Sequence, residues 1–255
     1  MNSLKMVFEG VGAYTDGLRY IRKLSLWHYF LAPAVITLAL LALMLASAFT
    51  WGTDLGGYLF TLYPYVYGAG VVSYILTALG FLLVLAIGLV VYKNAVLALS
   101  APVMSMMSER IEQELVEGYT APAFSPSRFL SDLRRGIRLG LYNGSKEFFA
   151  TIALLVLGLI PLLAPLAALG IFLLQAYYAG FCNLDYTLER HYTFKESVAF
   201  VRTYREFTLG NGIVFMLLLL TGIGFLIALP LSTASATVFA VQKVYGEKGV
   251  RLRSV

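Results

Sequence analysis

Charged side chains are scarce in this chain, and one long interval has almost none. Residues 24–92 contain no lysine or arginine, and Asp54 is the only charged side chain among them. Over the whole chain 13% of residues are charged and 59% are hydrophobic, whereas about a quarter of a soluble domain is charged. This composition excludes an ordinary soluble domain and predicts an integral membrane protein.

Cysteine and histidine are also scarce. Cys182 is the only cysteine, so no intrachain disulfide can form, and His28 and His191 are the only histidines. The sequence contains no HExxH, GxSxG, Walker or CxxC pattern. We therefore expect no enzyme activity, no metal site and no cofactor. Residues 1–28 lack the apolar core and cleavage site of a signal peptide, so we expect this segment to be retained.

The basic residues occur at intervals that predict a topology. Four of the nineteen precede residue 29, seven lie in 93–146, four in 183–206 and four after 242. Cytoplasmic loops of membrane proteins collect lysine and arginine. We therefore expect a multi-pass protein in which 29–92 crosses the membrane and returns, and in which the basic loops are cytoplasmic. The net charge of +5 then meets lipid headgroups, and we expect no nucleic-acid partner.

Two segments are predicted to span the bilayer as helices. Residues 29–51 are uncharged, and 23 helical residues cover ~35 Å against a hydrocarbon core of ~30 Å. The second spanning helix is predicted at 71–100. The glycine- and tyrosine-rich stretch that begins at Leu55 is interpreted as an interfacial turn, and Pro102 is expected to break the second helix.

Two later apolar runs, 148–182 and 209–242, are predicted to form helical hairpins. Each is too long for one span, and splitting each centrally leaves arms of ~12–16 residues, which are too short to cross. The expected breaks at the hairpin tips are Pro161, Pro165, Gly222, Gly224 and Pro230. Basic residues flank both runs, so we expect both hairpins to be half-inserted (re-entrant) from the cytoplasmic side. The alternative is four thin full spans with tight turns. Exposed tips need cover, which favours a homo-oligomer.

The polar segments complete an all-α, single membrane domain over 1–255. Residues 1–28 are expected to form an amphipathic interfacial helix on the membrane surface. Cytoplasmic helices are predicted at 105–147, a cytoplasmic segment at 183–206 and a basic tail at 243–255. A helix start is indicated by Pro126, with Ser125 or Ser127 as its cap.

The charges of the predicted cytoplasmic helices have two interpretations. They could form solvated surface ion pairs, which stabilise little. Alternatively they form a charge network at the mouth of a conduction pathway. The candidate residues for that mouth are Glu109, Arg110, Arg134, Arg138 and Arg205.

Three stretches together resemble one family of membrane proteins. They are SLWHYFLAP (25–33), LALSAPVMSMMSERIE (97–112) and YYAGFCNLDYTLERHYTFKESVAFVRTYREFTLGNG (177–212). Their order and spacing resemble the CysZ-type sulfate permeases and the etoposide-induced membrane-protein domain, over roughly 15–245. The resemblance implies a bacterial inner-membrane oligomer with two spanning helices and two half-inserted hairpins. It also implies passage of sulfate into the cell for cysteine biosynthesis, without an ATP-binding subunit.

The chain departs from that family at its anion-binding motif. Where sulfate-permease members typically read Gly-Leu-Arg-Arg before the first span, this chain has Ser25, Leu26, Trp27 and His28. An oxyanion is best bound by guanidinium groups, and the nearest basic side chains here are upstream. The resemblance therefore gives a candidate anion site comprising Arg22, Lys23, Ser25, Leu26, Trp27 and His28.

Two functions remain open from the sequence. The first is a permease or channel-like transporter for sulfate or a related small oxyanion, in which removing the charge of Arg134, Arg138 or Arg205 should lower flux. The second is a non-transporting membrane scaffold or lipid-interacting protein of the same fold, since half-inserted amphipathic hairpins wedge one leaflet and prefer anionic lipids.

Overall fold

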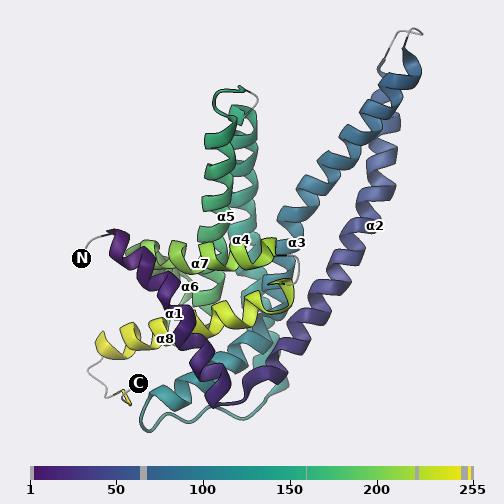
Figure 1. The fold of residues 1–255 in the computed structure, drawn as a ribbon. Coiled ribbons are helices and arrows are strands. Elements are labelled where there is room, and N and C mark those ends of the chain that lie inside the picture. The colour runs from purple at the N-terminus through teal and green to yellow at the C-terminus, as the bar shows by residue number, and fades with distance from the viewer. Residues whose placement is uncertain (1–2, 64–67, 159, 222–223, 248–251, 254–255) are drawn as a thin grey trace.

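The computed structural model is built from helices (Figure 1). It describes residues 3–63, 68–158, 160–221, 224–247 and 252–253. Within these ranges there is no β-strand, and one isolated antiparallel bridge pairs Val116 with Leu252. The all-helical class expected from the sequence is confirmed.

The first two long helices form an antiparallel pair that projects from the rest of the molecule (Figure 1). A short 3-10 helix, η1 (Leu26–Phe30), leads into α2 (Leu31–Thr61), and α3 (Ala69–Leu115) returns. The outer parts of both helices expose large apolar side chains, among them Leu38, Phe49 and Tyr74. Both predicted spanning segments therefore lie in helices whose apolar side chains face outward.

The expected turn lies within the predicted stretch but begins later than expected, because α2 continues as a helix from Leu55 to Thr61. Its glycines serve close packing instead. A Cβ atom on Gly52 would lie 2.6 Å from Cα of Phe81, and one on Gly56 would lie 2.4 Å from Cα of Thr77. Small residues allow such close backbone approach between helices in membranes. The residues between the two helices include 64–67, which lie outside the described residues.

The expected helix break at Pro102 is wrong. This proline lies inside α3, which runs unbroken from the apolar segment into the charged one. At this level α4 packs closely, since a Cβ atom on Gly136 would lie 2.6 Å from Cβ of Ala101 and 2.8 Å from the carbonyl oxygen of Ala98. Tertiary packing thus overrides the local cost of a proline in a helix interior.

The first predicted hairpin consists of α4 (Pro126–Gly158) and α5 (Ala164–Leu188), which stand side by side in Figure 1. The chain turns at Ile160–Leu163, which includes Pro161, and Pro165 lies in the first turn of α5. α4 begins at Pro126, directly after Ser125, as the start signal predicted. The predicted boundary at 147/148 is absent, because one helix carries both the charged and the apolar stretch.

The second predicted hairpin is formed by α7 (Arg205–Leu220) and α8 (Ala228–Glu247), with a 3-10 turn, η2 (Gly224–Leu226), between them. The expected break at Gly224 coincides with the start of η2, and Gly222 lies outside the described residues. Pro230 is not at the break. It lies in the first turn of α8, where a proline removes no intrahelical hydrogen bond.

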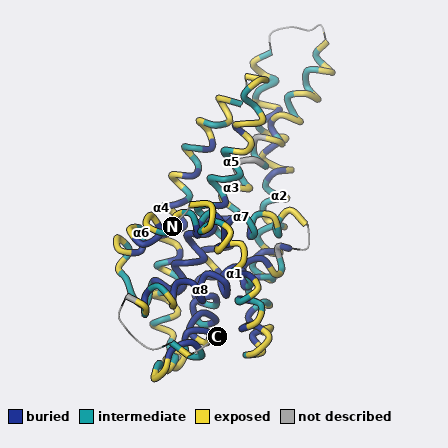
Figure 2. Tube along the Cα trace, turned by 60° about the vertical axis from the view of Figure 1, so that its left-hand side comes forward, coloured by how far each residue is buried: buried dark blue, intermediate teal, exposed yellow. Residues whose placement is uncertain are grey.

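The two hairpins differ in direction and in burial. α7 and α8 run across the base of the α4–α5 hairpin in Figure 1, and α6 (Phe194–Thr203) precedes them. The buried residues concentrate in this base, while the projecting arms are mostly exposed (Figure 2). The predicted amphipathic N-terminal helix is α1 (Ser3–Lys23), whose buried face packs against α7 and α8.

A polar junction lies where these helices cross. Asn211 of α7 donates to Ser235 Oγ of α8 at 2.6 Å and accepts from Asn183 of α5 at 2.9 Å. The hydroxyl of Tyr14 on α1 donates to the carbonyl oxygen of Asn211 at 2.7 Å. Each of these side chains is buried, so the hydrogen bonds fix how four helices cross.

By length and composition, two helical segments of the described chain could cross a membrane: Leu26–Thr61 and Ala164–Leu188. The first is 11% buried and the second 33% buried over its most apolar window, so both present apolar surface outward. The second segment is α5, whose 25 residues exceed the arm length expected for the 148–182 hairpin, so the expectation that this arm is too short to cross is wrong. The depth of either hairpin in a bilayer stays a prediction.

Candidate anion-binding site

Two adjacent pockets lie beside η1 and the last turns of α3. The larger has a volume of about 680 Å³ and the smaller about 210 Å³, and Tyr29 and Arg110 line both. The larger is lined by Leu24, Leu26, His28, Tyr29, Arg110, Gln113, Glu114, Gly118, Tyr119, Thr120 and Arg253. The chain segments that meet here are η1, α3, the 116–125 loop and the C-terminal bridge.

Basic groups outnumber acidic ones in the larger pocket. His28, Arg110 and Arg253 face one carboxylate, Glu114. Glu114 forms an ion pair with Lys23, whose Nζ lies 2.8 Å from Oε1 of Glu114. Nη1 of Arg253 lies 3.9 Å from Oε2 of the same carboxylate. Arg110 is exposed and takes part in no ion pair within the described part of the chain. Its guanidinium group is therefore available to an anion in solution.

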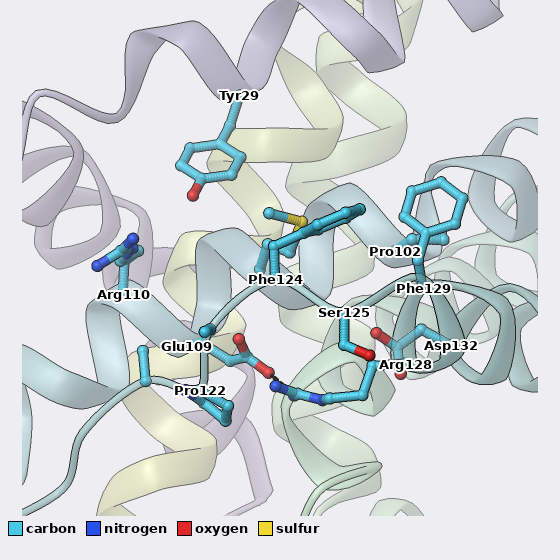
Figure 3. Close-up of a pocket in the computed structure, with 13 residues that line it drawn as sticks. Tyr29, Pro102, Glu109, Arg110, Pro122, Phe124, Ser125, Arg128, Phe129 and Asp132 are labelled. Atoms are coloured by element: carbon cyan, nitrogen blue, oxygen red, sulfur yellow. Dashed lines mark hydrogen bonds and ion pairs between the residues drawn. The ribbon is translucent and has the colours of Figure 1, made fainter.

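The smaller pocket contains an ion pair between Glu109 of α3 and Arg128 of α4 (Figure 3). Glu109 is 5% exposed, and Arg110 points away from this pair in Figure 3. Asp132 lies on the same side as Arg128, and burial raises the pKa of its carboxyl group. The smaller pocket is thus balanced in charge, whereas the larger one is basic.

A fully buried carboxylate, Glu112, lies on α3 between the pocket-lining residues Arg110 and Gln113. Arg190 donates to its Oε2 from Nε at 3.0 Å and from Nη2 at 2.8 Å. His191 and the hydroxyl of Tyr245 contact its Oε1 at 2.7 and 2.8 Å. Burial opposes ionisation, but the hydrogen bond from His191 and the charge of Arg190 together hold the pKa of Glu112 below its usual value.

A second buried cluster joins α4 to α5 and α6. Arg135 pairs with Asp185 through Nε and Nη2, and Nη2 also donates to Ser197 Oγ at 2.8 Å. Glu189 lies beside them and accepts a hydrogen bond from Ser105. Burial, together with the charges of nearby carboxylates, raises the pKa of Glu189 to about 8. The C-terminal end of α5 is therefore held to α3 and α4 by charge pairs.

A third buried pair joins the predicted spanning helix 71–100 to the end of the predicted cytoplasmic segment 105–147. Lys93 of α3 pairs with Glu147 of α4 and also donates to the carbonyl oxygen of Gln175 at 3.3 Å. Asn94 donates to the other carboxylate oxygen of Glu147 at 3.1 Å. Ionisable groups buried inside membrane proteins are usually paired and are often functional.

The predicted anion residues separate in the structure. His28 and Leu26 line the larger pocket, while Lys23 is engaged by Glu114. Trp27 is 51% exposed and packs its ring against Phe30 instead. Arg22 is exposed, and Ser25 has a left-handed backbone (φ 53°) with no side-chain capping bond.

The predicted mouth residues also divide. Glu109 and Arg110 line the pockets. Arg138 packs over the ring of Phe194 at 4.7 Å, and Arg205 pairs with its neighbour Glu206 at 3.2 Å. Arg134 is exposed on α4 and lines neither pocket. The structure thus brings only the first two together.

Several charged residues of the pockets and of the buried clusters beside them were missed from the sequence. They are Glu112, Arg128, Arg135, Arg190 and Arg253. The helical period offered a signal for one of them, since Arg135 precedes the buried series Gly136, Leu139, Asn143 and Glu147 on α4. No signal pointed to Arg253, which reaches the pocket through the bridge of Leu252 with Val116.

The described residues contain no group of three or more histidine, cysteine, aspartate and glutamate side chains that could hold a metal ion. The site therefore offers hydrogen-bond donors and positive charge to a ligand. Such groups bind anions and do not by themselves point to a reaction.

Comparison with known proteins identifies the family of this chain. A relative from Pseudomonas paraeruginosa, described as "Sulfate transporter CysZ", is 28% identical over 245 residues, which cover 92% of this chain and 95% of the relative. A family model described as "Sulfate transporter CysZ/Etoposide-induced protein 2.4" matches residues 13–230. The apolar helices and this match together support a membrane protein. The chain belongs to the sulfate transporter CysZ/etoposide-induced protein 2.4 family.

Proposed function

We propose that this protein carries sulfate or a related small oxyanion across the membrane, as a permease or channel-like transporter. The observation that carries the proposal is the basic pocket at the foot of the first helix pair, where Arg110 is unpaired among the described residues. Membership in the family and the relative described as a sulfate transporter support the choice of anion.

The chemistry of the pocket suits a doubly charged oxyanion. A guanidinium group donates parallel hydrogen bonds to two oxygens of such an anion, and Arg110 and Arg253 both line the pocket. His28 and Gln113 add further N–H donors. In this proposal the anion displaces the loose 3.9 Å contact between Arg253 and Glu114.

The neighbouring pocket offers a second cation along the same route. Arg110 lines both pockets, and the next arginine beyond it is Arg128, which Glu109 holds. An anion that leaves Arg110 would meet a cation already neutralised by a carboxylate, and would bind it more weakly. Conduction requires binding that is strong enough to admit the ion and weak enough to release it.

The proposal extends to the setting of the protein. We place it in a bacterial inner membrane as a multi-pass homo-oligomer with cytoplasmic basic loops, supplying sulfur for cysteine biosynthesis. The half-inserted position of the α4–α5 and α7–α8 hairpins belongs to this proposal as well.

Uptake into proteoliposomes tests the proposal. Purified protein is reconstituted, and entry of radiolabelled sulfate, sulfite, phosphate and chloride is compared with entry into protein-free vesicles. We expect saturable sulfate entry that excess unlabelled sulfate suppresses. If only another oxyanion enters, that oxyanion and not sulfate is the substrate. No entry of any anion through folded, reconstituted protein would overturn transport and favour a lipid-interacting scaffold.

A further inference from the structure

An apolar groove of about 470 Å³ runs between α3 and α4, on the outside of the molecule. Its α3 wall includes Val91, Ala95 and Leu99, and its α4 wall includes Ile137, Leu141 and Phe148. Several of these side chains are exposed, with Val91 at 60% and Leu141 at 70%. Exposed apolar patches of this kind in a membrane protein need an apolar occupant.

Close packing of the two helices forms the floor of the groove. A Cβ atom on Gly140 would lie 3.3 Å from Cβ of Ala98, and one on Gly144 would lie 3.4 Å from the side chain of Asn94. Small residues on both helices therefore leave the groove open between the larger side chains at the edges of the groove. The groove is a consequence of the helix crossing.

The length of the groove matches one lipid leaflet. Its α4 wall extends from Ile137 to Phe148, and eleven residue steps of helix cover ~17 Å. Half of a bilayer hydrocarbon core is ~15 Å. An extended acyl chain of one leaflet therefore fits along the groove.

A free cation stands at one end of this wall. Arg134 precedes Ile137 by three residues and Leu141 by seven, so all three lie on one face of α4. Arg134 is exposed and makes no ion pair with any residue that the structure describes. It lies about one helical turn beyond the apolar wall, where the phosphate of a bound lipid would be.

We propose that the groove between α3 and α4 binds one acyl chain of an anionic phospholipid, whose phosphate pairs with Arg134. The chain occupies the apolar wall, and the guanidinium group selects for a net negative headgroup. A basic side chain near the membrane surface favours anionic lipid by about fivefold. The inference does not depend on whether the protein transports an anion.

Native mass spectrometry of the purified protein, titrated with phosphatidylglycerol or phosphatidylcholine, tests the site. We expect one phosphatidylglycerol to be retained in preference to phosphatidylcholine. Arg134→Gln should reduce that preference about fivefold, whereas Arg202→Gln, at another exposed arginine, should leave it unchanged. Ala95→Phe, which fills the groove, should reduce retention of both lipids.

Several results would overturn the proposal. One is an unchanged preference in Arg134→Gln, which alters an exposed side chain and should leave the fold intact. Another is an equal loss of preference in Arg202→Gln, which would show a general charge effect. A third is a change in subunit number without a change in lipid retention for Ala95→Phe, which would assign the groove to a second copy of the chain.

Discussion

Arg135 of α4 donates from Nε to Oδ2 of Asp185 at 3.0 Å and from Nη2 to Oδ1 at 2.8 Å. This two-point pairing joins the charged half of the first hairpin to the end of α5. The Asp185 side chain is 3% exposed, so it lies in a medium where an unpaired carboxylate is costly. The pair therefore holds the base of the molecule together.

Removing the guanidinium group should destabilise the protein strongly. Arg135→Ala leaves Asp185 buried without its partner, and breaking such a pair costs about 3–5 kcal/mol. Arg135→Lys should recover only part of this loss, because the ammonium group keeps the positive charge but cannot donate to both oxygens of Asp185 as the guanidinium group does. Thermal unfolding in detergent measures both variants. The neighbouring Arg134→Ala is the control, and an equal loss of stability there would contradict the assignment.

The raised pKa of Glu189, about 8, makes stability depend on pH. The folded protein keeps a proton that the unfolded chain releases near the ordinary value of 4.5, so this group's contribution becomes less favourable as pH rises from about 4.5 to about 8. Glu189→Gln mimics the protonated form. It should be more stable than the unchanged protein above pH 8, by on the order of a few kcal/mol, and equal near pH 4.5.

Melting temperatures of both proteins across pH 4.5–9 check this sign. Glu117→Gln, at an exposed carboxylate, is the control and should leave the curve unchanged. A difference in melting temperature between Glu189→Gln and the unchanged protein that grows toward low pH would contradict the prediction.

The crossing of α5 and α7 leaves no room for a methyl group. A Cβ atom on Gly212 would lie 1.7 Å from the carbonyl oxygen of Ala176. Gly212→Ala must separate these helices and should cost about 1–3 kcal/mol or more. Gly12→Ala is matched to it, since nothing lies within 4 Å of that position and alanine favours a helix. Equal melting temperatures for both variants would show that the helices do not cross as described.

The position of His28 predicts how the anion site can be strengthened. His28 lines the basic pocket, whereas Trp27 is turned away from it and packs against Phe30. His28→Arg should therefore tighten oxyanion binding about tenfold, as a charged hydrogen bond contributes about 1.5–3 kcal/mol. Trp27→Arg should change it much less. Sulfate binding by calorimetry compares them, and the opposite order would place the site on the Trp27 side.

The sequence predicted the helical class and the hairpin plan because both depend on local patterns. Uncharged runs, basic flanks and the breaks near Pro161 and Gly224 each leave a mark within a few residues. Pro102 and the glycines of α2 led to the wrong predictions. Their effect depends on a partner helix, and the same residue types that end helices also allow helices to pack closely.

The site was predicted only in part, because its contacts join distant segments. Arg190 reaches Glu112 across 78 residues, and Arg135 reaches Asp185 across 50. The sequence marked Arg134 and Arg138 and missed Arg135, because only the packing of α4 decides which arginine turns inward. Arg110 and His28 were marked separately, and the structure places them in one pocket.

Sulfate uptake by proteoliposomes containing Arg110→Gln tests the central claim most directly. The pocket account predicts that this variant, reconstituted in equal amount, takes up sulfate about tenfold more slowly at low sulfate concentration than the unchanged protein. Arg202→Gln, an exposed arginine outside both pockets, should retain full uptake. Equal sulfate uptake by Arg110→Gln and the unchanged protein would contradict the assignment of this pocket to the anion.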